Sequence, residues 1–218
     1  MSRFHGASRV VLAVLAAISA VAAPAAAQAP VVERAYVTVG LFGDVKRFSG
    51  DPTESTLDGQ AAGASLAMGT FIGSRWGLQV ALDMSGFSRT EHPRDVTFQR
   101  DTITLTSVAE NQALSVSSLL RFRASSHGRV RLGYLGGLTF VRLYRKFHTT
   151  APTGTPSALI PKPDERVDYS AAPTVGIDAR IQLTEHLSLV PGLQACVFRF
   201  SDESGLLLRP RIGVRWAF

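Results

Sequence analysis

The sequence contains a single cysteine, Cys196, in 218 residues. One cysteine excludes an internal disulfide, so the fold must be stabilised by packing or by closure of a sheet. Cys196 is interpreted as a small inward-facing residue, and the less favoured alternative is a reactive thiol. His92, His127 and His148 lie in separate connections without metal-ligand spacing. The sequence therefore predicts neither a metal nor a cofactor.

Long apolar runs are also missing once the first 27 residues are set aside. No stretch after Gln28 approaches the roughly 18 residues of a transmembrane helix, although 45% of the residues are hydrophobic. Strong positive charge is missing too, because loss of Arg3 and Arg9 lowers the formal net charge from +6 to +4. No Lys/Arg cluster resembles a nucleic-acid-binding stripe. We therefore expect no nucleic-acid partner.

Residues 1–27 have the three-part layout of a secretory signal peptide. Two arginines precede an apolar run over 10–23, and three alanines at 25–27 supply the small residues of a cleavage site. A membrane anchor is the disfavoured alternative, because the run is shorter than about 20 residues and a cleavage pattern follows it. We predict that 1–27 is removed and that 28–218 forms one domain.

Apolar and polar residues alternate along most of this predicted domain. One set is Trp76, Leu78, Val80, Leu82 and Met84, and the set between them is Gly77, Gln79, Ala81, Asp83 and Ser85. The alternation recurs over 208–218, where Arg209, Arg211 and Arg215 fall on the polar side. A period of two places the two sets on opposite faces of a β-strand.

This periodicity predicts eight strands whose connections alternate in length. The short connections are 73–75, 124–128 and 184–186, and the long ones are 47–60, 88–101 and 145–168, with a shorter one at 201–205. Residues 102–111 also alternate, which predicts that the third and fourth strands continue beyond the membrane as a hairpin. The predicted fold is all-β: an eight-stranded antiparallel transmembrane β-barrel, an up-and-down meander without helices.

The polar face decides between a soluble and a membrane barrel. It carries Asp83, Asp178, Arg180, Arg211 and Arg215. Several charges inside a soluble barrel would be costly, whereas in a membrane barrel this face lines the lumen and the apolar face meets lipid. Eight strands leave an interior that side chains just fill. The charges are therefore interpreted as an ion network that plugs the lumen, and the alternative is the lining of a narrow pore.

Aromatic residues gather at strand ends next to short turns or the C-terminus. Trp76, Phe122, Trp216 and Phe218 are predicted to form a girdle at the inner membrane interface. The last strand ends in apolar residues at alternate positions, Ile212, Val214, Trp216 and Phe218. With the signal peptide and the eight strands, this ending resembles the small outer-membrane barrels of the OmpA/OmpX type. The resemblance implies a cell outer-membrane location, contact with outer-membrane lipid, and recognition of the terminal residues by the outer-membrane assembly machinery.

The only enzyme-like spacing is His186-Leu187-Ser188, which is similar to the His-x-Ser of outer-membrane lipid A deacylases. A nucleophilic serine needs a positioned base and an acid that orients the base. Strand direction places His186 at the periplasmic end, whereas lipid A lies in the outer leaflet. We therefore interpret the pair as a turn residue followed by a lumen-facing serine.

Together these patterns predict a monomeric, non-enzymatic outer-membrane barrel with no catalytic residues. Its role would be structural, in envelope integrity, or interactive, through binding of an extracellular ligand by the long loops. The first alternative is a narrow channel or carrier for small solutes. The second alternative is an outer-leaflet enzyme that modifies the acyl chains of lipid A.

Overall fold

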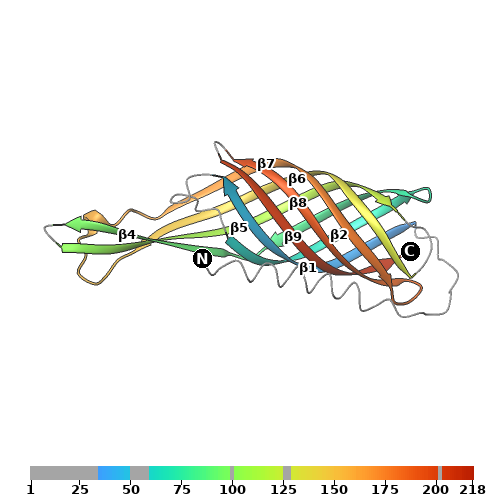
Figure 1. Ribbon diagram of the computed structural model, residues 1–218, viewed down its shortest axis with the longest axis horizontal. Coiled ribbons are helices and arrows are strands. Elements are labelled where there is room, and N and C mark those ends of the chain that lie inside the picture. Colours follow the sequence, from blue (N-terminus) through green and yellow to red (C-terminus); the bar gives the residue numbers. More distant parts are fainter. Residues whose placement is uncertain (1–33, 50–58, 99–100, 125–128, 201–202) are drawn as a thin grey trace.

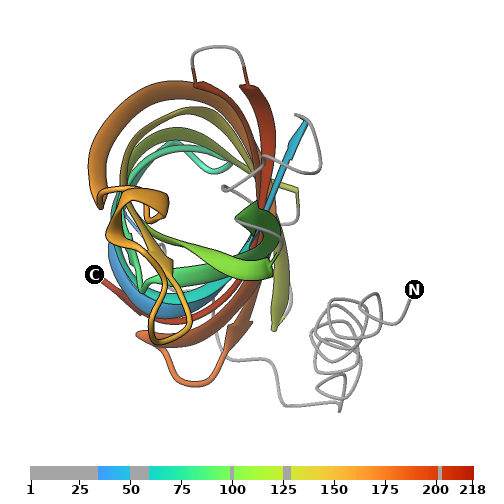
Figure 2. The same cartoon turned by 90° about the vertical axis from the view of Figure 1, so that its left-hand side faces the viewer.

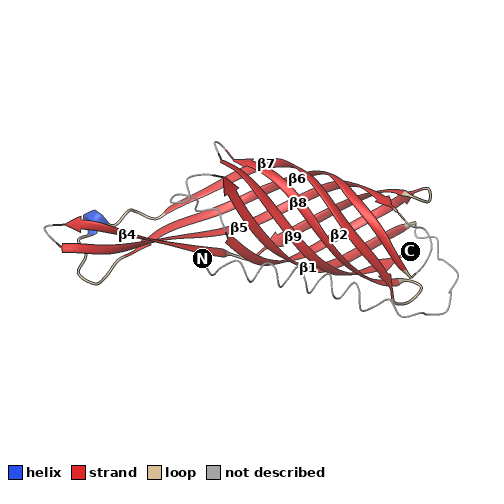
Figure 3. Cartoon of the chain, viewed as in Figure 1, coloured by secondary structure: helices blue, strands red, loops and turns tan. Residues whose placement is uncertain are grey.

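The computed structural model describes residues 34–49, 59–98, 101–124, 129–200 and 203–218 (Figure 1). The predicted signal peptide lies outside these residues. The described part contains β1 (Ala35–Ser49), β2 (Gly59–Ile72), β3 (Trp76–Ser85), β4 (Ser88–Phe98), β5 (Asp101–Arg123), β6 (Val130–Thr150), β7 (Asp164–Gln182), β8 (Leu187–Phe200) and β9 (Glu203–Ala217). Its one helical turn is a 3-10 segment, Ser157–Leu159 (Figure 3). None of the helical structure in these ranges is long and apolar enough to cross a membrane.

Eight of the strands close into an antiparallel ring. Neighbours along the chain pair from β5 to β9 and from β1 to β3, and β9 pairs with β1. The ring is completed by β3 and β5, which pair from Trp76↔Phe122 to Met84↔Leu114. The end-on view in Figure 2 shows the closed wall. The predicted eight-stranded barrel is therefore confirmed. We call the end with the C-terminal Phe218 the terminal end and the opposite end the distal end.

The strand β4 occupies a segment that was expected to be a loop. Residues 88–98 were expected to form part of a long connection, but they pair with β5 from Ser88↔Asn111 to Phe98↔Asp101. This segment has no apolar alternation to mark it as a strand. The hairpin predicted from the alternation over 102–111 is present, and it extends far beyond the ring (Figure 1).

The strands β6 and β7 also run past the ring and shorten the connection expected over 145–168. Their register continues distally to Phe147↔Asp164, and β5 remains paired with β6 as far as Thr106↔Thr150. A four-stranded sheet of β4, β5, β6 and β7 therefore projects from one side of the barrel. We call the part beyond the ring the distal sheet.

The outer wall is apolar and the interior is polar. Along β3, every second residue is exposed, and the exposed residues are the large apolar ones, such as Leu78 at 48% and Leu82 at 46%. The last strand behaves in the same way, with Ile212 at 48% exposed and Arg215 at 2%. In water such a surface would be unfavourable, whereas in a bilayer it is the surface that lipid chains contact.

Candidate functional site: the closed interior

Charged side chains fill much of the barrel interior. The buried charged residues of the described part are Asp44, Lys46, Asp83, Arg121, Arg131, Arg145, Asp178, Arg180, Arg209 and Arg215. A charge in a water-poor interior is tolerated when hydrogen bonds and an opposite charge compensate it. Whether these buried charges are compensated therefore depends on how they pair with each other.

Arg209 of β9 is the centre of the ion cluster nearer the distal end. Its Nε lies 2.7 Å from Asp44 Oδ1 on β1, and its Nη1 lies 2.6 Å from Asp83 Oδ2 on β3. The same Nη1 donates to Ser115 Oγ on β5, across the ring, at 3.1 Å. The ring of Phe42 packs on the guanidinium, with 4.3 Å from Cζ to the ring centroid. One arginine thus ties four strands together across the interior.

Arg121 of β5 is the centre of a second cluster nearer the terminal end. Its Nη2 forms a salt bridge with Asp178 Oδ1 on β7, and its Nη1 donates to Gln79 Oε1 on β3 at 2.9 Å. The Tyr36 hydroxyl on β1 donates to the same Gln79 oxygen at 2.8 Å. Gly133 leaves the space for the salt bridge, because a Cβ at that position would lie 2.7 Å from Asp178 Oδ1.

Arg215 joins this second cluster from β9. Its Nη2 lies 3.9 Å from Asp178 Oδ2, and its Nε donates to Thr38 Oγ1 at 3.1 Å. Its guanidinium also lies over the Tyr36 ring, 4.0 Å from the centroid, as in a cation–π contact. Asp178 therefore compensates two arginines, one on each side of its carboxylate.

Arg211 lies between the two clusters without a carboxylate partner among the described residues. Its Nη2 donates to Ser65 Oγ at 2.8 Å, and its Nη1 is buried with no hydrogen-bond partner in that part of the chain. The cavity beside it, bounded also by Thr38, Gln79 and Arg215, has about 10 Å³ of free volume. That volume suits about one water molecule.

Hydroxyl groups form a row across the wall of β5, β6, β7 and β8. Ser117 and Thr139 share a hydrogen bond at 2.8 Å, and Thr139 and Thr174 share one at 2.6 Å. Thr174 then donates to Cys196 Sγ at 3.2 Å. Cys196 is 2% exposed, so it is a small inward-facing residue, as the sequence indicated.

An apolar cluster lies on the distal side of this row, on the inner face of β5 to β9. It consists of Ala113, Val141, Leu143, Ala172, Cys196, Phe198 and Leu207, none more than 5% exposed. Cys196 and Leu207 are register partners on β8 and β9, and Leu207 is the next inward residue after Arg209. Apolar side chains therefore line this part of the interior wall on the distal side of Arg209.

The five residues predicted for the ion network lie in the barrel interior, where the two clusters contain further members. Asp178 binds Arg121 and Asp83 binds Arg209, whereas Arg211 donates to Ser65. Arg180 donates to Ser188 Oγ at 2.8 Å. Arg209 was expected on the polar face, but not as a member of the ion network.

Two other members, Asp44 and Arg121, were also missed. Their inward parity was readable from the sequence, but their partners were not. Pairing across a barrel depends on the stagger of strands that are distant in sequence.

The His186 and Ser188 side chains have separate partners. His186 stacks on Trp216, with ring centroids 5.8 Å apart, and its Nδ1 lies 3.1 Å from the Ala217 carbonyl oxygen. Ser188 is fully buried and accepts the hydrogen bond from Arg180. This arrangement supplies no base to the serine. The described residues also contain no cluster of three or more His, Cys, Asp or Glu that could hold a metal ion.

The predicted girdle residues all lie on the outer wall at the terminal end. The rings of Trp76 and Phe122 are register partners with centroids 4.8 Å apart. Trp216 is 50% exposed and Phe218 is 64% exposed, and the Phe218 amide donates to the Ala35 carbonyl at 2.9 Å. Ile212 and Val214, the other members of the predicted assembly signal, continue the same exposed face of β9. Tyr36 points inward and is not part of the girdle.

The distal sheet carries charged residues, some exposed, such as Arg89 and Glu91, and some buried, such as Arg145. Arg89 and Glu91 of β4 form a salt bridge at 2.9 Å, and Thr104 Oγ1 donates to Asp95 Oδ1 at 2.7 Å. On β7, Asp168 binds Arg145 at 2.8 Å and Arg166 at 2.9 Å. The backbone of the distal sheet is held by strand pairing along β4, β5, β6 and β7. The distal sheet is thus an ordered polar surface at one end of a closed barrel.

Comparison with known proteins identifies the same architecture. The model of the outer membrane protein beta-barrel domain family matches residues 13–195. None of the curated protein sequences matches the chain significantly. The structure is similar to Neisserial surface protein A, with a TM-score of 0.54, 13% identity, and coverage of 84% of this chain and 97% of that one.

Two further solved structures have comparable similarity. The attachment invasion locus protein Ail of Yersinia pestis has a TM-score of 0.51, 13% identity, and coverage of 84% of this chain and 99% of that one. OprG of Pseudomonas aeruginosa has a TM-score of 0.50, 13% identity, and coverage of 85% and 96%. At this level of identity the likeness concerns the fold.

Proposed function

Since the chain belongs to the outer membrane protein beta-barrel domain family and is located in the cell outer membrane, we propose that it is a non-enzymatic, non-conducting barrel that presents the distal sheet for binding at the cell surface. Bacterial barrels of this kind have short periplasmic turns and longer extracellular connections. The terminal end, with Phe218, is accordingly the periplasmic end. The distal sheet then projects outside the cell.

The observation that carries the proposal is the continuous strand pairing from the barrel into the distal sheet. β5 is paired over its whole length, first with β3 inside the ring and then with β4 beyond it. A surface held by backbone hydrogen bonds loses less conformational entropy on binding than a flexible loop. Pro93 and the charged residues of β4 also discourage non-specific pairing at this open edge. These features suit a specific binding surface.

The two alternatives have less support. A channel would need a path through both charged clusters and the apolar cluster, and the cavity at Arg211 has room for about one water. A lipid A-modifying enzyme would need a base beside Ser188, whose partner is Arg180.

The closed ring leaves no unpaired barrel edge, which favours a monomer surrounded by outer-membrane lipid. Recognition by the assembly machinery is proposed for the exposed terminal residues Trp216 and Phe218.

Removal of the distal hairpin tests this function. Arg89 and Glu110 are register partners, so residues 90–109 can be replaced by an Asn-Gly turn that joins two paired positions. Cells that carry the full or shortened protein would be compared for retention on immobilised matrix proteins and acidic polysaccharides. We expect the full protein to increase retention on at least one surface and the shortened protein to lose that increase.

The control is the folded state of the shortened barrel, measured by the shift of its band on a semi-native gel. Equal retention of cells with full and shortened protein, at equal levels of folded barrel, would contradict the proposal. Retention of neither above cells without the protein would contradict it as well.

A further inference from the structure

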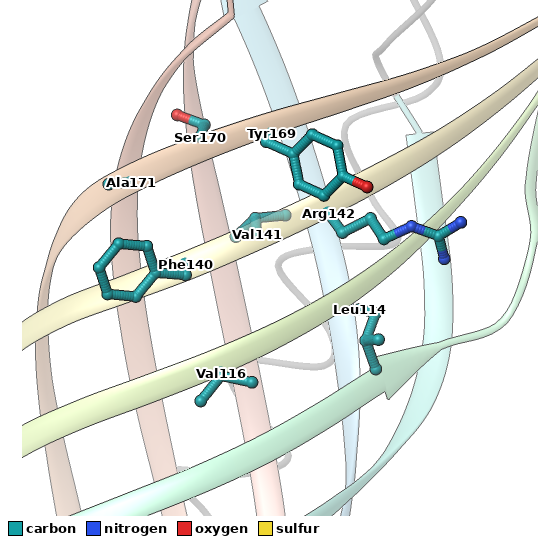
Figure 4. A pocket seen from close by; sticks show the side chains of 8 residues that line it. All are labelled: Leu114, Val116, Phe140, Val141, Arg142, Tyr169, Ser170 and Ala171. Atoms are coloured by element: carbon teal, nitrogen blue, oxygen red, sulfur yellow. The ribbon is translucent and has the colours of Figure 1, made fainter.

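The outer wall contains one feature that a smooth lipid-facing surface would not have. A groove of about 340 Å³ runs over β5, β6 and β7 (Figure 4). Its lining residues are Leu114, Val116, Phe140, Val141, Arg142, Tyr169, Ser170 and Ala171. The side chains of Val116, Phe140 and Tyr169 are 44%, 57% and 72% exposed, so the groove opens to the membrane and not to the barrel interior.

The groove is hollow because a small residue lies among large ones. Register pairs Val116 with Phe140 and Phe140 with Ala171, which makes one outward row across the three strands. In this row, the methyl group of Ala171 leaves a gap beside the Phe140 ring. The Tyr169 ring, two residues along β7, borders the gap on its distal side. The floor of this part of the groove is therefore apolar.

The distal end of the groove is polar. Leu114, Arg142 and Tyr169 form the next outward row, two residues closer to the cell exterior on each strand. Figure 4 shows the Arg142 guanidinium and the Tyr169 hydroxyl pointing the same way, away from Phe140. Among the described residues, the Arg142 side chain makes no ion pair or hydrogen bond. A cation on the lipid-facing wall is destabilising unless it reaches the headgroup level or an anion.

The order of these groups matches the order of groups in one membrane lipid. The apolar row lies deeper in the membrane, and the cation and phenol lie toward the outer surface. We propose that the groove binds lipid A of the outer leaflet, with an acyl chain over Ala171 and Phe140 and a phosphate bound by Arg142. Phosphate and guanidinium form a strong charge-assisted, often bidentate pair, and Tyr169 adds a donor at the same level.

Native mass spectrometry of the folded barrel with added lipid A tests the site. Arg142→Gln removes the charge and keeps a polar side chain of similar reach. Ala171→Phe fills the groove and leaves the charge in place. Arg75→Gln is the matched control, since Arg75 is exposed in the turn between β2 and β3 at the periplasmic end. Semi-native gels show whether each variant is folded, and two independent variants keep the test valid if one fails to fold.

The site predicts a one-to-one lipid A adduct with the unmodified protein. Arg142→Gln should raise the Kd for lipid A by about tenfold, as loss of one charge-assisted contact would. Ala171→Phe should also raise the Kd because its ring occupies the space for the acyl chain, and Arg75→Gln should leave the Kd unchanged. Dephosphorylated lipid A and phosphatidylglycerol should bind more weakly than lipid A. Unchanged binding in both variants, or equal binding of dephosphorylated lipid A, would overturn the site, and equal binding of phosphatidylglycerol would overturn its assignment to lipid A.

The lipid site and the distal binding surface are separable. The shortened protein that lacks residues 90–109 retains every residue of the groove, so it should bind lipid A like the full protein. If the deletion leaves both cell retention and lipid A binding unchanged, only the function proposed for the distal sheet is contradicted, and the lipid site stands.

Discussion

Arg209 on β9 and Asp83 on β3 approach to 2.6 Å across the barrel interior, although 126 residues separate them in sequence. Both side chains are at most 2% exposed, and Asp44 shares the same guanidinium. Two carboxylates and one arginine thus form a compensated unit that joins strands from different hairpins. The stability of the barrel should depend on this unit more than on any surface pair.

Replacement of Arg209 by alanine should strongly destabilise the barrel. The change leaves Asp44 and Asp83 buried without their shared cation, and removing one partner of a buried pair typically costs about 3–5 kcal/mol. Urea unfolding in detergent micelles measures the loss, and the folded band on a semi-native gel should shift at a lower temperature.

Two other arginines provide the comparison. Arg211→Ala should cost less than Arg209→Ala, because Arg211 contacts Ser65 and no carboxylate among the described residues. Arg89→Ala removes one partner of an exposed pair with Glu91 and should change stability by less than about 1 kcal/mol. Equal losses for all three variants would show that the buried unit has no special role.

Gly133→Ala should disturb the second ion cluster without touching a charged residue. The new Cβ would lie 2.7 Å from Asp178 Oδ1 and 3.0 Å from Arg121 Nη2, so the salt bridge must shift. We expect a loss of about 1–3 kcal/mol in urea unfolding, as for other overpacked sites. Gly136→Ala is the control on the same strand, since nothing lies within 4 Å of its added Cβ. A loss at Gly136 as large as that at Gly133 would contradict the steric explanation.

The strands of the ring could be predicted because their two faces meet different solvents. In β3 and β9, lipid on one side and a polar interior on the other impose an alternation that is visible residue by residue. The strand β4 has water on both faces in its distal part, so its sequence around Arg89, Glu91 and Pro93 has the composition of a loop. Its pairing with β5 could not be derived from the segment itself.

Which residues pair in the ion clusters could not be predicted from the sequence, for a different reason. The inward positions of Asp44, Arg121 and Arg209 follow from parity, but parity gives no depth relative to other strands. The stagger of the closed sheet brings Arg209 to Asp83 and leaves Arg211, two residues along the same strand, against Ser65. A shift of two residues in one strand would exchange these partners.

Phe218 should be required for assembly. Its backbone pairs with Ala35 on β1 and its ring is 64% exposed at the periplasmic end, where the assembly machinery could bind it. Deletion of Phe218, or Phe218→Asp, should sharply lower the outer-membrane level and leave protein in the periplasm. Cell fractionation measures both pools. Wild-type outer-membrane levels of the two variants would refute this role of the terminus.

Ser188→Ala and His186→Ala should not change the acylation of lipid A. Ser188 is buried with Arg180, and His186 stacks on Trp216, so the two do not form a nucleophile and base. Mass analysis of lipid A from cells that overexpress each form is the measurement. Trimming of an acyl chain by the unmodified protein, abolished by Ser188→Ala, would establish an enzyme in place of the proposed binding protein.

The proposal that the barrel is an anchor and not a pore depends on an interior that the two ion clusters fill. The current through a planar bilayer that contains the purified, folded, unmodified protein tests this claim directly. We expect no steady conductance above the protein-free bilayer, because the cavity beside Arg211 has room for about one water and apolar side chains pack around Leu207. Stable single-channel steps from the unmodified protein would contradict the proposal.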